Sequence, residues 1–220
     1  MILAAMTHSE TEFLKFAIDS EVLRFGEFTL KSGRVSPYFF DAGLFNTGRQ
    51  IATLGSFYAA LLAKREPEPF MLYGPAYKGI PLATATAAAL SQQHHRDVAF
   101  AFNRKEAKDH GEGGEVIGAP LRGRVVIIDD VITAGLSVEE SVSIIRTAGA
   151  KPAAVAIALD REEKMNTSDL SAVAEVEAQY DFPVHAIAHF STLVSYLSNE
   201  SDHARYEPAM TAYRTRYGSR

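Results

Sequence analysis

Two spacings of hydrophobic residues along the chain predict where its helices and strands lie. Residues 10–23 and 49–63 carry apolar side chains at helical spacing, so both are expected to be helices that pack on a core. The segment between them, residues 25–46, is rich in glycine, serine and aromatic residues. That composition predicts short strands and a binding loop.

From residue 70 onward, short apolar runs alternate with helical patterns. We expect strands at 70–73, 98–102, 124–128, 153–159 and 184–188, and helices at 80–90, 138–148, 170–179 and 192–197. The run Val125–Ile128 is apolar at every position, which is typical of a parallel strand covered on both faces. The alternation predicts an α/β fold with a mostly parallel, twisted sheet flanked by helices, and ligands at the carboxyl ends of the strands.

Composition narrows the class of protein. The chain has 220 residues, of which 47% are hydrophobic, enough for one large domain with a core of its own. Its 22 Lys and Arg against 27 Asp and Glu form no basic stripe, so nucleic acid is not an expected partner. The absence of cysteine excludes disulfides and thiol catalysis. No secretory signal or membrane-length apolar stretch is visible, so we expect a cytoplasmic protein that does not enter a membrane.

The most informative segment is Val125–Ser137, in which an apolar strand ends in two carboxylates and a loop of small residues. Such a loop and the helix after it direct N–H groups at an anion, and Gly135 allows close approach of the backbone. The segment therefore suits a phosphomonoester, while Asp129 and Asp130 can accept bonds from ribose hydroxyls. Taken alone, the residues leave a second interpretation open, in which the two aspartates only cap the next helix.

Two further segments contain cations near predicted strand ends. Residues 74–79 combine glycines with Lys78 and suit a second anion such as pyrophosphate, although such turns also occur for geometry alone. Residues 103–114 interleave cations with acids, lack an apolar anchor, and suit a lid that closes over a ligand. A solvated hairpin is the alternative interpretation of that segment.

Another pair of segments points to a flat anionic base. Residues 29–41 place Lys31, a tight turn and the aromatic pair Phe39 and Phe40 together, although aromatic residues in strands usually belong to a core. Arg161 follows the strand 153–159, where its guanidinium can clamp a carboxylate with two bonds. A surface arginine that opens the next helix is the alternative.

The string Val125–Ser137 resembles the signature with which type I phosphoribosyltransferases bind 5-phosphoribosyl 1-diphosphate (PRPP). Residues 103–114 look almost letter for letter like the catalytic lid of the bacterial orotate phosphoribosyltransferases, and the similarity runs from about Glu12 to the C-terminal helices. It implies one type I phosphoribosyltransferase domain over residues 1–220. A small hood and base pocket would occupy about 1–48, with C-terminal segments as further candidates for the hood, and the PRPP-binding core about 68–190.

The resemblance implies an enzyme that transfers phosphoribosyl from PRPP to orotate with the help of Mg²⁺, yielding orotidine 5′-monophosphate and pyrophosphate in pyrimidine synthesis. It also implies a homodimer in which each lid reaches into the neighbour's site. The loop at 74–79 would contain a cis peptide bond between Ala76 and Tyr77. One departure is Leu136, where many relatives carry a hydroxyl residue, so a phosphate contact there would use the backbone N–H alone.

Carried over residue by residue, the resemblance implies a role for each matching position. The catalytic residues would be Lys108, Asp129 and Asp130, with Mg²⁺ held mainly by PRPP and water and one of the two aspartates nearby. Orotate would contact Lys31, Phe39, Phe40, Thr133 and Arg161. PRPP would contact Lys31, Tyr77, Lys78, Arg104, Lys105, Lys108, His110, Asp129, Asp130, Val131, Ile132, Thr133, Ala134, Gly135, Leu136 and Ser137. Two other functions remain as alternatives, namely a phosphoribosyltransferase for another nucleobase and a non-catalytic regulator that senses PRPP.

Overall fold

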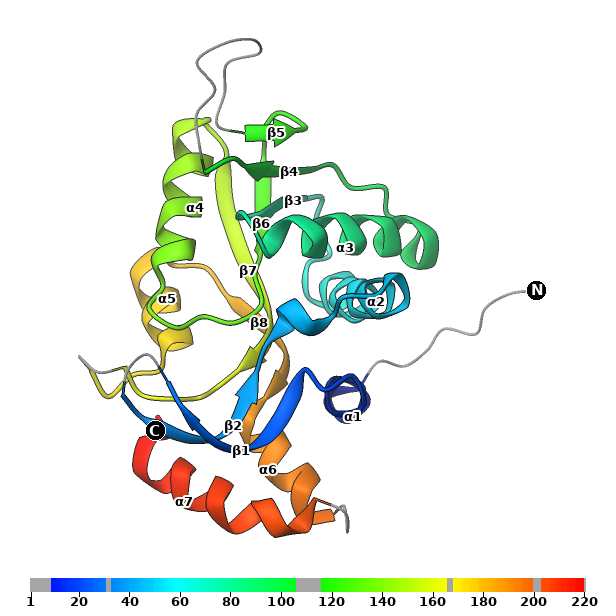
Figure 1. The fold of residues 1–220 in the computed structure, drawn as a ribbon. Coiled ribbons are helices and arrows are strands. Elements are labelled where there is room, and N and C mark those ends of the chain that lie inside the picture. The colour runs from blue at the N-terminus through cyan, green and yellow to red at the C-terminus, as the bar shows by residue number, and fades with distance from the viewer. Residues whose placement is uncertain (1–8, 31–32, 106–115, 166–167, 200–202, 220) are drawn as a thin grey trace.

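A six-stranded sheet forms the centre of the protein (Figure 1). The structure is a computed structural model that describes residues 9–30, 33–105, 116–165, 168–199 and 203–219. Its strand order is β5-β4-β3-β6-β7-β8, and every pairing is parallel except that of β5 with β4. The strands are β3 (Met71–Gly74), β4 (Phe100–Asn103), β5 (Val116–Gly118), β6 (Arg124–Ile128), β7 (Lys151–Asp160) and β8 (Val184–His189).

Helices cover both faces of this sheet because its central strands are apolar on both sides. In β6, Val126 and Ile128 join a core with α2 (Gly48–Arg65) and α3 (Gly79–His94), whereas Val125 and Ile127 join a second core with α4 (Leu136–Thr147) and α5 (Ala172–Tyr180). Figure 1 shows α4 and α5 on one side of the sheet and α2 and α3 on the other. The alternation of side chains along each strand produces the two cores.

A second, two-stranded sheet lies beside the main one. It is an antiparallel hairpin of β1 (Leu23–Thr29) and β2 (Val35–Phe40), followed by the 3₁₀ turn η1 (Ala42–Leu44). The hairpin and α1 (Glu10–Asp19) share a core with the last helices of the chain. These are α6 (Phe190–Asn199), η2 (Ala204–Tyr206) and α7 (Glu207–Tyr217).

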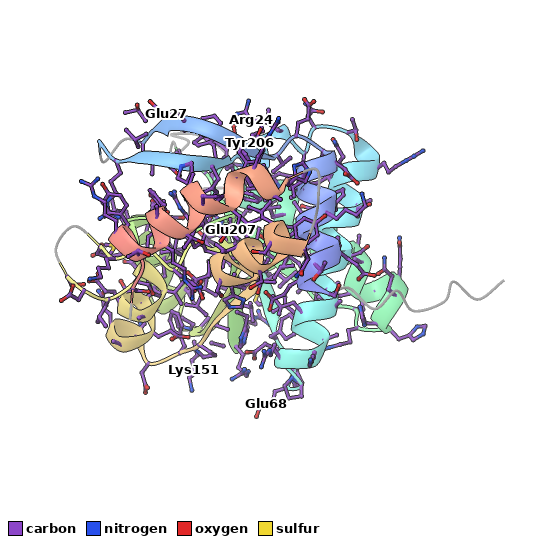
Figure 2. All side chains as sticks on the ribbon, turned by 90° about the horizontal axis from the view of Figure 1, so that it is seen from below. Arg24, Glu27, Glu68, Lys151, Tyr206 and Glu207 are labelled. Carbon is purple, nitrogen blue, oxygen red and sulfur yellow. The ribbon has the colours of Figure 1, made fainter. Side chains whose placement is uncertain are left out.

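The hairpin lies away from the amino ends of the main strands. Figure 2 shows Arg24 and Glu27 of β1 on one side of the molecule, and Glu68 and Lys151 on the opposite side. Glu68 precedes β3 and Lys151 begins β7, so both mark amino ends of parallel strands. The hairpin, which we call the hood from here on, therefore lies on the carboxyl side of the sheet, where parallel sheets bind their ligands.

The α/β fold expected from the hydrophobic pattern is confirmed, with three local differences. The first helix was expected over 10–23 but ends at Asp19, because Ser20 and Glu21 form a turn and Leu23 already pairs with Phe40 in the hairpin. Strand β5 and helix α7 were not expected. β5 has only three residues, and the mean hydropathy of α7 is low, so neither produces a clear pattern. None of the helices that the structure describes is long and apolar enough to span a membrane.

Helices α2 and α3 approach closely at Gly55, and this contact yields a test of the packing. A Cβ atom on Gly55 would lie 2.6 Å from the backbone carbonyl of Ala85, too close for either helix to accept without moving. We predict that Gly55→Ala lowers the stability by about 1–3 kcal/mol, which corresponds to a Tm lower by roughly 3–10 °C.

The matched control is Gly48→Ala at the exposed start of the same helix, where nothing lies within 4 Å of the new methyl group. Its Tm should be unchanged or slightly raised, since alanine favours helix over glycine. Equal Tm values for the two variants would contradict the close approach of α2 and α3.

Candidate active site

Three charged side chains from separate segments meet at the carboxyl side of the sheet. Lys78 follows β3, and its Nζ lies 2.8 Å from Oδ2 of Asp130, which follows β6. The same Nζ lies 3.3 Å from Oδ1 of Asp41, which follows β2 in the hood. Burial on its own lowers the pKa of the Lys78 ammonium, but Asp130 and Asp41 raise the pKa above its ordinary value. Lys78 therefore remains charged and links the hood to the main sheet.

Asp129, the first of the two aspartates after β6, is held by hydrogen bonds at both its backbone and its side chain. Its backbone carbonyl accepts a 2.7 Å bond from the buried Tyr58 hydroxyl, and its Oδ1 accepts a bond from the N–H of Asp130 at 2.9 Å. Burial, followed by the neighbouring charge of Asp130, raises the pKa of Asp129 to about 6, against smaller lowering effects of hydrogen bonds from the Asp130 N–H and Ser137. The structure thus holds the Asp129 carboxyl group beside a second carboxylate, in a place that disfavours the charge of Asp129.

The loop between Asp130 and α4 is exposed at its tip and anchored at its base. Ile132 is buried in the core with α4, and the N–H of Val131 donates to Oδ1 of Asp130 at 2.9 Å. Thr133 and Ala134 are exposed, and the side chain of Leu136 is 70% exposed. Gly135 precedes α4 in the left-handed region at φ 72°. A glycine supplies no capping side chain, so the first N–H groups of α4 face outward at the positive end of the helix dipole.

The loop after β3 carries the cis peptide bond that the resemblance implies, between Ala76 and Tyr77. Asn103, the last residue of β4, accepts a 2.7 Å bond from the Ala76 N–H and donates to Glu140 of α4 at 3.3 Å. The ring of Tyr77 is 68% exposed, and Nζ of Lys105 lies 5.5 Å from its centroid. Arg104 follows Asn103 directly, so two of the expected lid cations begin next to this loop.

Arg161 lies just past the end of β7, one strand away from Asp130. Its guanidinium bonds Oε1 of Glu163 through Nη2 at 2.7 Å and through Nε at 3.0 Å. Nε also donates to the Tyr38 hydroxyl at 3.1 Å. Burial alone lowers the pKa of Arg161, but Tyr38 and Glu163 raise the pKa above its already high ordinary value. The structure therefore holds one charged guanidinium just past the end of β7, on the strand next to the one that ends in the two aspartates.

Comparison with known proteins identifies the family. A model of the phosphoribosyl transferase domain matches residues 49–186, more than half of the chain. An orotate phosphoribosyltransferase of Thioalkalivibrio sulfidiphilus is 56% identical, over 95% of this chain and 98% of that protein. Another, from Herminiimonas arsenicoxydans, is 58% identical over 97% and 99% of the two chains. The chain belongs to the orotate phosphoribosyltransferase family.

A solved structure of the same family supports the fold. The 1.9 Å crystal structure of an orotate phosphoribosyltransferase from Francisella tularensis matches with a TM-score of 0.85 and 43% identity, covering 94% of this chain and 99% of that one. The resemblance noted in the sequence and the type I phosphoribosyltransferase fold are both confirmed. The same matches show that the chain is an enzyme, a pentosyltransferase.

The aromatic residues expected to border orotate lie on opposite sides of β2. Phe39 stacks on Phe28 of β1 with ring centroids 5.5 Å apart, whereas Phe40 packs toward Phe13 of α1 at 6.4 Å. It is the buried Tyr38, the residue before Phe39, that contacts Arg161. Lys31, Lys108 and His110 lie outside the described residues, so their roles stay predictions, as do the ligand contacts of the other site positions.

Sequence reasoning overlooked several polar residues that this family member uses to hold the site together. Asp41 ends the segment 29–41 and was assigned no role there, although it bonds Lys78. Asn103 and Tyr58 support the loop and the aspartate pair from other elements. Glu163 is the main partner of Arg161. None of the four left a signal in the sequence. Even the contact between Arg161 and Glu163 depends on Glu162, which turns the backbone between them at φ 49°.

The raised pKa of Asp129 predicts a pH-dependent cost in stability. In the folded protein the Asp129 carboxyl keeps its proton up to about pH 6, whereas in the unfolded chain it loses the proton near pH 4. The contribution of Asp129 to the free energy of unfolding therefore falls as the pH rises between these two values. We predict that Asp129→Asn, which removes this charge, is more stable than the parent at pH 7.5 by about 1–3 kcal/mol. The gain should shrink toward pH 4.5, and urea unfolding at several pH values measures it.

Asp97→Asn removes one carboxylate from an exposed position and serves as the control for net charge. An Asp129→Asn variant whose stability relative to the parent does not change with pH would contradict the assigned burial of that charge.

Proposed function

We propose that this enzyme catalyses the reversible, Mg²⁺-dependent transfer of the phosphoribosyl group of PRPP to N1 of orotate, with pyrophosphate as the other product. This is the reaction that its family contributes to pyrimidine biosynthesis. The observation that carries the proposal is the convergence of two carboxylates, an ammonium, an uncapped helix and a guanidinium at one edge of the sheet. Each group matches one part of the two substrates.

PRPP would bind along the edge formed by the ends of β3 and β6. The exposed loop 133–137 and the N-terminus of α4 suit the 5′-phosphate, because their N–H groups and the helix dipole favour a dianion. Asp129 and Asp130 suit the ribose hydroxyls as hydrogen-bond acceptors. The buried side chain of Ile132 anchors this loop, so Val131 and Ile132 would contribute through their backbone only.

In the proposed reaction the C1′–O bond to pyrophosphate breaks and a bond from N1 of orotate to C1′ forms. Pyrophosphate leaves with the electron pair, so negative charge grows on it while the ribose becomes electron-poor. Lys78 is positioned to offset the leaving charge, and Arg104 and Lys105 follow the neighbouring strand β4. The carboxylates of Asp129 and Asp130 would stabilise the ribose at the same moment. Lys108, expected to be the main electrostatic catalyst, stays a prediction.

The donor groups present fit Mg²⁺ that arrives with PRPP. Within the described residues no group of three or more His, Cys, Asp or Glu side chains could enclose a metal ion. Mg²⁺ typically keeps several waters and binds through one or two carboxylates together with substrate phosphates. Asp129 and Asp130 are the residues that would approach it. When bound, the ion supplies positive charge that neutralises the diphosphate.

Orotate would be recognised through its carboxylate by Arg161. The guanidinium is charged, only 19% exposed, and lies past the end of β7, next to β6 and its aspartates. A partly buried guanidinium favours a planar anion over a neutral base. In this proposal Arg161 is the residue that would separate orotate from uracil or adenine as the acceptor.

The deciding experiment measures turnover by the purified protein with PRPP, Mg²⁺ and each of three bases: orotate, uracil and adenine. We expect product only with orotate, and none when EDTA removes Mg²⁺. Turnover of another base would replace the assigned substrate. Binding of PRPP without turnover of any base would instead indicate a regulator.

Replacing the guanidinium tests orotate recognition. We predict that Arg161→Ala raises the KM for orotate by roughly 10–100-fold, since a charge-assisted contact contributes about 1.5–3 kcal/mol. The KM for PRPP should change much less, because in the proposed site the ribose and phosphate groups would contact other residues. Steady-state kinetics with each substrate varied in turn measures both values. An equal rise in the two would show that Arg161 supports the whole site.

A homodimer with composite sites is also part of the proposal, and complementation tests it. Lys108→Ala and Asp130→Asn should each be nearly inactive, since one is expected to lose the lid cation and the other a ribose contact. If the lid acts on the neighbour's site, mixing the two inactive proteins should restore up to about a quarter of the activity, because hybrid dimers contain one intact site. No recovery under proven subunit exchange would rule out the shared site.

A further inference from the structure

The guanidinium of Arg161 is held on one edge and one face. Glu163 accepts from Nε and Nη2 on the same edge, at 3.0 and 2.7 Å. The ring of Tyr38 lies under the guanidinium, 5.4 Å from its central carbon to the ring centroid. The contacts with Glu163 therefore lie on the Nε–Nη2 edge of the guanidinium. The Nη1–Nη2 edge takes no part in them, and it can bind another carboxylate with two parallel bonds.

Glu163 is itself restrained by segments that are distant in the sequence. Its Oε2 lies 3.7 Å from Nη1 of Arg34, and its Oε1 accepts from the Tyr38 hydroxyl at 3.2 Å. Both partners come from the hood hairpin. The side chain of Glu163 is only 13% exposed, so it has little freedom to rotate toward solvent.

The C-terminal tail fixes the backbone at this position. Glu163 forms an antiparallel bridge with Gly218, and the N–H of Lys164 donates to the carbonyl of Tyr217 at 2.8 Å. Arg34 places its guanidinium 5.0 Å from the Tyr217 ring centroid and donates to the Lys164 carbonyl at 2.9 Å. The end of α7 therefore belongs to the structure that holds Glu163.

We propose that Glu163 is a positioning residue for substrate specificity, which aims the Nη1–Nη2 edge of Arg161 at the carboxylate of the acceptor base. The proposal rests on the function argued above, in which Arg161 binds orotate. Glu163 contacts no reacting atom. It reduces the number of orientations that the guanidinium samples before the base arrives, so that less entropy is lost on binding.

The opposite role would be that of a competitor, with Glu163 occupying the guanidinium until orotate displaces it. A competitor must be free to leave. Glu163 is instead held by Arg34, by Tyr38 and by the backbone bridge to Gly218. The two roles predict opposite changes in orotate affinity when the carboxylate is removed, which makes them separable by experiment.

The test compares Glu163→Gln with the parent enzyme by steady-state kinetics. The amide keeps the size of the side chain but loses the charge that orders Arg161. We expect the KM for orotate to rise by about tenfold or more, while the KM for PRPP and kcat stay within about twofold. Glu68→Gln is the matched control, because it makes the same chemical change at a carboxylate that is 69% exposed, contacts Arg124 and lies on the side of the molecule opposite the hairpin (Figure 2). Its constants should equal those of the parent.

Tyr38→Phe provides a second, independent variant if Glu163→Gln does not fold. It keeps the stacked ring but removes the hydroxyl that accepts from Nε of Arg161, so a smaller rise in orotate KM of roughly threefold is expected. An unchanged or lower KM for orotate in a folded Glu163→Gln variant would overturn the proposal, and a lower value would establish competition. Absence of orotate turnover by the parent enzyme would refute the proposed function instead.

Discussion

Strand β6 is buried on both faces, and this constraint determines where the site can form. Its four last residues are apolar and fully covered by helices, so the chain leaves the sheet directly into two carboxylates that water barely reaches. Charge in such a place is unfavourable unless it has partners. Lys78 is the partner of the Asp130 carboxylate, and the backbone N–H of Asp130 donates to the carboxylate of Asp129. Burial of these charges destabilises the fold, and the apolar packing of the sheet offsets that cost.

The hood hairpin contacts the main sheet at the same edge, where the strands end in charged residues. Asp41 reaches Lys78 from the end of β2, and Tyr38 of the same strand reaches Arg161. Through these two contacts, one hairpin touches both the region expected to hold pyrophosphate and the region expected to hold the base. The parallel strands supply a rigid base, while the hairpin completes the site from a segment far away in the chain.

Helix α7 and the residues that follow it pack against the hood and the segment after β7. The sequence of α7 shows no clear pattern, yet this helix packs on β2 and its end pairs with the segment after β7. Arg34, Glu163 and Tyr217 form one connected group at that point. The C-terminal tail therefore contributes to the surroundings of Arg161 without containing a residue expected to touch a substrate.

Local patterns in the sequence determined most of the fold, because burial on both faces selects continuous apolar runs and amphipathic helices repeat at 3.6 residues. They placed β6 at 124–128 and located the two aspartates, Lys78 and Arg161 at strand ends. Local patterns did not predict the end of α1, the three-residue β5 or the polar α7. The position of each depends on pairing or packing with residues distant in the sequence. The same is true of Asp41, Asn103 and Glu163. Their hydrogen-bonding partners come close only when the hood, the sheet and the C-terminal tail assemble. The local sequence around a carboxylate or amide does not show which cation or N–H group it will contact.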